Sequence, residues 1–136
     1  MKLLSIRIIT SNMNGMIDFY EKITGENATR YTPDFAEVKT DTLTIAIGST
    51  ETLQLFGGAE IASAASNRSL IIEFLTKNVE DDFEKISAFP GIEIVQPPTL
   101  MPWGNLSLLI RDPDGNLVNI FRPVSDEAKA KFNIVE

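Results

Sequence analysis

Residues 20–23 have the sequence Tyr20-Glu21-Lys22-Ile23, and residues 83–86 have the closely similar sequence Phe83-Glu84-Lys85-Ile86. Each tetrapeptide belongs to a segment with helical spacing of apolar residues, and an asparagine, Asn12 or Asn78, precedes each segment as a plausible N-cap. A Leu- and Ile-rich run precedes each asparagine, and three short β-type runs follow each helix. The duplication predicts an α+β fold built from two βαβββ modules.

The repeat also predicts the domain boundaries. We expect a first module over residues 1–60, a small, polar linker over 61–67, a second module over 68–124, and a C-terminal helix and tail over 125–136. A repeat of this length is too long for a solenoid, which indicates a duplicated supersecondary unit within one structural domain.

Composition excludes several classes of function. The chain has no cysteine and no histidine, so disulfides, thiol nucleophiles, the commonest metal ligand and the commonest general base are all absent. A net charge of −7 argues against nucleic-acid binding and permits a cationic partner. No apolar stretch is long enough to cross a membrane, and the N-terminal run is too short for a signal peptide, so we expect a cytoplasmic protein without a membrane partner.

The last hairpins of the two modules align without a gap, which predicts final strands over residues 52–56 and 117–121. A turn over 112–116 would pair Leu109 with Asn119 and separate the two faces of the second hairpin. One face is apolar and is expected to pack on a helix. The other mixes Ser, Thr, Asn, Gln, Arg and Phe, which suits a small-molecule pocket. The aligned apolar positions are Leu43, Ile45, Leu53 and Leu55 in the first module, and Leu108, Ile110, Val118 and Ile120 in the second.

Arg7 and Glu73 occupy equivalent positions on the opening strands of the two modules. They could form a buried ion pair that joins the modules, or they could bind a ligand. The sequence leaves both interpretations open.

Three motifs in their order resemble those of the vicinal oxygen chelate superfamily, which contains glyoxalase I, extradiol dioxygenases and bleomycin-resistance proteins. They are Asp-Phe-Tyr-Glu-Lys at 18–22, Met-Pro-Trp-Gly at 101–104, and Arg-Asp-Pro-Asp-Gly-Asn at 111–116 followed by Leu-Val-Asn-Ile-Phe. The resemblance extends from residue 3 to residue 123. It implies modules whose sheets curl around a shared cleft, and it implies a homodimer.

Enzymes of that superfamily hold a divalent metal on these sheets. The resemblance places the four ligand positions at Ser5, Gln54, Ile71 and Asn119. Neutral amides and a hydroxyl bind hard cations weakly, and isoleucine cannot bind one. We therefore expect no metal and no other cofactor, and we assign no catalytic residue.

Within the superfamily, the chain most resembles the bleomycin-resistance branch. The members of that branch bind no metal and sequester cationic, aromatic drugs. It implies a metal-independent binding protein for a small molecule, and antibiotic resistance is one possible role. Trp103 could stack on a flat cation, or it could anchor its loop to the sheet; the phenylalanines could line a pocket or fill the core. The candidate ligand-binding residues are Arg7, Phe35, Gln54, Phe56, Glu73, Met101, Trp103, Arg111, Asn119 and Phe121.

Two alternatives remain open at the level of sequence. One is a metal-independent enzyme that uses Glu37 or Glu73 for acid–base chemistry and Arg7 or Arg111 to hold an anionic substrate. The other is a structural or regulatory dimer with a vestigial pocket.

Overall fold

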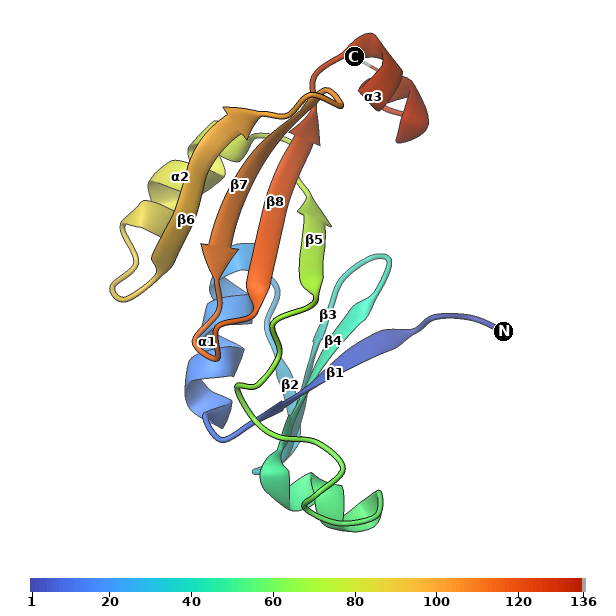
Figure 1. Cartoon of the computed structure of the whole chain (residues 1–136), viewed down its shortest axis with the longest axis vertical. Helices are drawn as coiled ribbons and strands as arrows, with labels where there is room; N and C mark the ends of the chain where they lie inside the picture. Colours follow the sequence, from blue (N-terminus) through green and yellow to red (C-terminus); the bar gives the residue numbers. More distant parts are fainter. Residues whose placement is uncertain (136) are drawn as a thin grey trace. The chain divides into compact units, whose positions relative to one another are not determined.

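The computed structural model describes residues 1–135, and its first module opens with strand β1 (Ser5–Thr10) and helix α1 (Met13–Thr24) (Figure 1). Asn12 caps the helix, because its side chain accepts a hydrogen bond from the Gly15 N–H at 3.1 Å. Gly25 ends it in the left-handed conformation at φ 75°. The predicted helix start at Asn12 is confirmed, and Tyr20 of this helix is fully buried in the core.

Three strands follow α1 and form a mixed sheet with β1, in the order β1-β4-β3-β2. β1 runs parallel to β4, and the other pairs are antiparallel. Helix α1 packs on β3 and β4, whose inward side chains, including Val38, Ile45 and Ile47, are buried. The strands are β2 (Thr29–Thr32), β3 (Phe35–Lys39) and β4 (Thr44–Ser49).

The strand predicted over residues 52–56 is wrong: this segment belongs to a 3₁₀ helix, η1 (Thr50–Leu55), coloured green in Figure 1. Ser49 caps η1, since its hydroxyl accepts the Glu51 N–H at 3.2 Å. The turn leaves Leu53 3% exposed but Leu55 87% exposed. Alternation of apolar residues could not reveal this, because the serine cap competes locally with strand continuation.

The last strand of the first module is therefore β4, and the gapless alignment of the two final hairpins is wrong. Each sheet has one parallel strand pair at its edge. In the register of these pairs, Arg7 lies opposite Ala46 in the first module, and Glu73 lies opposite Asn119 in the second. The first-module equivalent of Asn119 is thus Ala46, and Gln54 lies outside the sheet.

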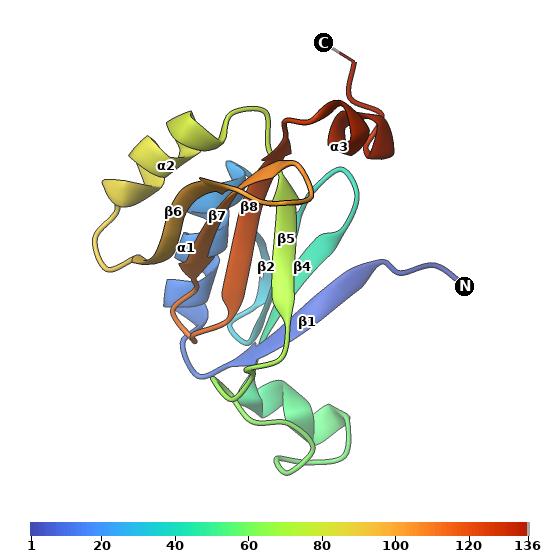
Figure 2. The same ribbon diagram turned by 45° about the horizontal axis from the view of Figure 1, so that its top comes forward.

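The second module repeats the topology, with strand order β5-β8-β7-β6 (Figures 1 and 2). Asn78 caps α2, accepting the Asp81 N–H at 3.0 Å, and Ser125 caps α3, accepting the Ala128 N–H at 3.1 Å. The helix start at Asn78 and a helix within residues 125–136 were both predicted. The elements are β5 (Ile71–Leu75), α2 (Val79–Ser87), β6 (Glu93–Leu100), β7 (Asn105–Arg111), β8 (Leu117–Pro123) and α3 (Asp126–Lys131).

The predicted register of the second hairpin is confirmed: Leu109 faces Asn119, and Arg111 faces Leu117. Helix α2 covers one face of this sheet, and it packs against β6, β7 and β8. The predicted apolar set lies on that face, where Leu108, Ile110, Val118 and Ile120 are all buried. The opposite face of the sheet is consequently free to carry polar side chains.

By its internal contacts the chain forms two compact units, residues 1–67 with 113–115, and residues 68–112 with 116–136. Within the described part of the chain, no helix is both long and apolar enough to span a membrane.

Candidate functional site

The face of the β5–β8 sheet that α2 does not cover carries Glu73, Ser107 and Asn119, here called the acceptor face. Alternation along three neighbouring strands places them there. Glu73 on β5 is paired with Asn119 on β8, and on β7 Ser107 lies two residues before the partner of Asn119. All three side chains therefore lie within reach of one small molecule.

The hydrogen bonds of the acceptor face are incomplete. The Asn119 Nδ2 donates to Glu73 Oε2 at 2.8 Å, but the buried Asn119 Oδ1 has no partner. Ser107 is 2% exposed, and its Oγ also lacks one. Buried polar atoms are normally paired, so two unpaired atoms on one face indicate a missing partner such as a water or a ligand. Because the amide oxygen and the carboxylate are acceptors, that partner would supply donors.

In the first module Arg7 contacts two aromatic rings. Its guanidinium lies 4.5 Å from the Phe35 ring centroid and 5.1 Å from that of Phe56. The Arg7 side chain reaches these rings over Gly48, where an added Cβ would lie 3.7 Å from Arg7 Cδ. The predicted Arg7–Glu73 pair would join the two modules and stays a prediction; each residue has the partner described here within its own module.

The aromatic contacts of Arg7 continue from Phe35 to Tyr31 on β2, the edge strand of the first-module sheet. The Phe35 ring stacks on Tyr31 at 5.8 Å between centroids, and a hydrogen bond with Tyr31 raises the pKa of the exposed Lys39. Phe35 and Phe56, predicted to line a ligand site, thus hold a cation of the protein itself.

The four strand positions at which superfamily enzymes bind metal do not fit a metal in this chain. With the first-module register corrected, they are Ser5, Ala46, Ile71 and Asn119, of which two are purely aliphatic. Among residues 1–135, no group of three carboxylate, imidazole or thiol side chains is placed so that it could hold a metal ion. We therefore derive no chemistry through a metal.

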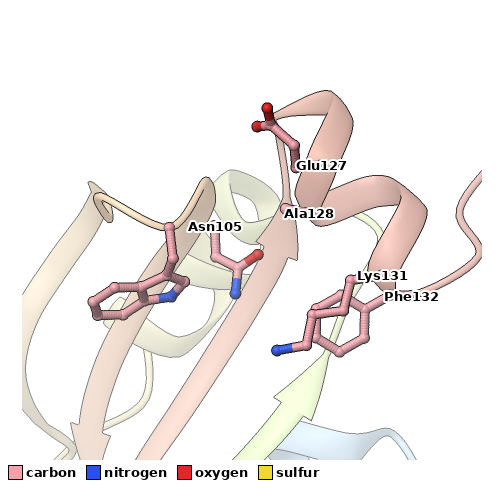
Figure 3. Close-up of a pocket in the computed structure, with 6 residues that line it drawn as sticks. Asn105, Glu127, Ala128, Lys131 and Phe132 are labelled. Atoms are coloured by element: carbon pink, nitrogen blue, oxygen red, sulfur yellow. The ribbon is translucent and has the colours of Figure 1, made fainter.

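A hollow of about 210 Å³ lies between the turn before β7 and helix α3 (Figure 3). The turn is closed by a hydrogen bond from the Gly104 N–H to the Met101 carbonyl at 2.9 Å, and it carries Trp103, which is 66% exposed. The lining residues are Trp103, Asn105, Glu127, Ala128, Lys131 and Phe132.

Of the remaining predicted site residues, Arg111 and Phe121 lie on the same side of the sheet as the acceptor face, whereas Gln54 and Met101 lie outside the strands. Gln54 is exposed on η1, and Met101 is half-buried at the start of the turn. Arg111 pairs with Glu93, with Nε 3.3 Å from Oε2. Phe121 is buried, and its ring lies 5.4 Å from that of Phe132.

Sequence reasoning missed Asn105, Lys131 and Phe132 as site residues. Asn105 begins the alternation that continues at Ser107, so its face could have been predicted. The two α3 residues could not, since only the tertiary fold returns this helix to the turn that carries Trp103.

The fold and its register can now be compared with known proteins. The model of the Glyoxalase/Bleomycin resistance protein/Dioxygenase superfamily matches residues 2–120. The chain belongs to this superfamily. The match confirms the resemblance that the repeated helix and the turn motifs indicated.

Several solved structures share the fold, and the first two described here are glyoxalase/bleomycin resistance protein/dioxygenase proteins. A member from Nocardioides is 18% identical, with a TM-score of 0.76 over 93% of this chain and 85% of its own. An enzyme of the family from Burkholderia phytofirmans PsJN is 19% identical, with a TM-score of 0.77 over 91% and 100%. A virulence protein from Salmonella typhimurium is 25% identical, with a TM-score of 0.71 over 91% and 98%. No curated protein sequence matches the chain.

Proposed function

We propose that this superfamily member is a metal-independent binding protein for a small cationic, aromatic molecule that lies on the acceptor face. The observation that carries the proposal is the pair of buried, unpaired atoms there, the Asn119 amide oxygen and the Ser107 hydroxyl, next to the exposed carboxylate of Glu73.

The chemistry of these groups favours a cation with several N–H donors, such as an amidinium or a guanidinium. Such a group would pair with the Glu73 carboxylate and donate to the Asn119 oxygen, and charge-assisted bonds of this kind are the strong ones. The net charge of −7 would also attract a cation from a distance.

The test is a binding screen with benzamidine and related aromatic amidines, read by thermal shift and calorimetry. We expect saturable binding that Glu73→Gln and Asn119→Leu each weaken at least about tenfold, the cost of one charge-assisted bond. Glu84→Gln, which removes the same charge from the exposed side of α2, is the matched control and should bind like the native protein. Absence of binding by every amidine, or equal binding by all variants, would refute the proposal.

The same screen tests independence of metal. Because the strand positions lack ligands, exhaustive chelation should leave both the melting temperature and the affinity unchanged. A drop in either upon chelation, reversed by adding Zn²⁺ or Mn²⁺, would show that a metal is used.

A metal-independent enzyme is the second candidate, favoured by the hydrogen bond that orients Glu73 through Asn119. A positioned carboxylate can act as a general base. In that case Glu73→Gln would abolish turnover of a bound molecule but only weaken its binding, whereas a pure binding protein would return the ligand unchanged.

A further inference from the structure

The hollow under α3 lies on the same side of the β5–β8 sheet as the acceptor face, beyond Ser107 toward α3, and it is built around a buried, unpaired amide. Asn105 is 8% exposed, and its Oδ1 has no hydrogen-bond partner. Figure 3 shows this side chain directed into the space between β7 and α3. Leaving a buried acceptor unpaired costs about 1–3 kcal/mol, so the hollow favours an occupant that brings an O–H or N–H donor.

The position of α3 is fixed closely enough to make this a formed site. The Gly104 carbonyl accepts the N–H groups of Val124 and Ser125, at 2.8 and 3.1 Å. Ala128 is buried against the same turn, and a Cβ on Gly104 would lie 3.3 Å from the Ala128 Cβ. The hollow is therefore bounded on both sides by anchored backbone.

The walls of the hollow are aromatic. The Phe132 ring is held against Phe121 at 5.4 Å, and the Trp103 indole borders the same space while remaining largely exposed. A flat ring entering between them would bury apolar surface of its own and of Trp103.

Two charged side chains line the hollow, Lys131 and Glu127, and they lie one helical turn apart on α3. The Lys131 ammonium lies 5.2 Å from the Phe132 ring centroid, which holds this side chain over the wall of the hollow. In Figure 3 it extends from α3 toward β8, the neighbour of the strand that carries Asn105, whereas Glu127 lies one turn away at the start of the helix. A ligand carboxylate would pair with Lys131 and avoid Glu127.

We propose that this hollow binds a small planar aromatic carboxylate that carries an O–H or N–H donor. The ring stacks on Trp103, the donor pairs with Asn105 Oδ1, and the carboxylate pairs with Lys131. None of the residues that line this site belongs to the acceptor face, and the ligand proposed for that face has the opposite charge.

The probes are the three hydroxybenzoate isomers, added to the ¹⁵N-labelled full chain. The single tryptophan gives one indole N–H resonance, which reports on the hollow directly. We expect at least one isomer to shift this resonance and the Asn105 side-chain amide saturably. Benzoate lacks the donor and hydroxybenzyl alcohol lacks the charge, so each should bind at least about fivefold more weakly.

Variants assign the charge and the acceptor. Lys131→Met should weaken hydroxybenzoate binding at least about fivefold while leaving hydroxybenzyl alcohol unchanged. Lys129→Met, on the same helix but outside the lining, is the matched control and should bind like the native chain. Asn105→Ser should remove the preference for hydroxybenzoate over benzoate, and the same spectra verify that each variant is folded.

Three results would overturn the inference. They are no saturable shift of the Trp103 indole with any isomer, equal effects of the two lysine substitutions, or tighter binding of benzylamine than of the hydroxybenzoates. Glu73→Gln should leave hydroxybenzoate binding intact, so a failure here is distinguishable from a failure of the acceptor-face proposal.

Discussion

Gly104 illustrates how one residue sets the geometry of the α3 hollow. Its φ of 92° favours glycine, and a Cβ there would lie 2.7 Å from the Ser125 Cβ. Gly104→Ala should therefore lower the free energy of unfolding by about 2–4 kcal/mol, combining backbone strain with overpacking. Chemical denaturation measures this difference.

Gly115 is the matched control, because its φ of 87° is similar but a Cβ there would meet no atom within 4 Å. Gly115→Ala should cost only the strain, about 1–2 kcal/mol. Equal losses for the two substitutions would mean that α3 does not press on residue 104.

Ser107 gives a second prediction at the scale of the residue: removing its hydroxyl should not reduce the stability of the fold. Its buried hydroxyl has no partner, so Ser107→Ala removes a desolvated group and should leave the melting temperature unchanged or raise it slightly. Ser49 is the comparison, since this buried serine donates to Asp34 at 2.7 Å and caps η1. Ser49→Ala should lose about 1–2 kcal/mol.

The outcome that contradicts this reasoning is a clear loss of stability in Ser107→Ala. It would mean that the hydroxyl has a partner in solution, such as an ordered water. The expected pattern instead combines preserved stability with weakened binding of the amidine ligand.

At the scale of the element, η1 distinguishes the observed first module from the hairpin that alternation predicts. A strand would place Leu53 and Leu55 on the same buried face, whereas η1 buries only Leu53. Leu53→Ala should therefore cost about 2–5 kcal/mol, and Leu55→Ala less than about 0.5 kcal/mol. Equal losses in denaturation experiments would favour the strand.

The helices were predictable because each has a local signal at its start: Asn12, Asn78 and Ser125 each cap the helix that follows. The register of the second hairpin followed from its turn at 112–116. The prediction of the first hairpin was wrong because the Ser49 hydroxyl starts a 3₁₀ helix through a short-range hydrogen bond. The spacing of apolar residues gives no sign of such a bond.

The candidate sites were predictable only in part. Alternation placed Asn119 and Ser107 on one face, but whether a buried acceptor is satisfied depends on neighbouring strands. The hollow around Asn105 additionally requires α3 to return to the turn of Trp103, which no local pattern encodes.

At the scale of the whole molecule, exposed apolar residues lie at the edge strand of each sheet. Leu4, which precedes β1, is 70% exposed, and Ile71 on β5 is 50% exposed; β1 and β5 are the first strands of their sheets. Open, apolar edges favour pairing with another chain. We propose the homodimer that membership of the superfamily led us to expect, with the β1 edge in its interface.

Sedimentation equilibrium should therefore give twice the mass of the 15.0 kDa chain. Leu4→Glu should raise the dimer dissociation constant at least about tenfold, because it introduces a charge into an apolar contact. Leu55→Glu is the matched control: Leu55 is more exposed than Leu4, at 87% against 70%, but it lies on η1 rather than at a sheet edge, so dimerisation should persist. A native chain that sediments as a monomer at high concentration, or equal effects of both substitutions, would remove the β1 edge from any interface.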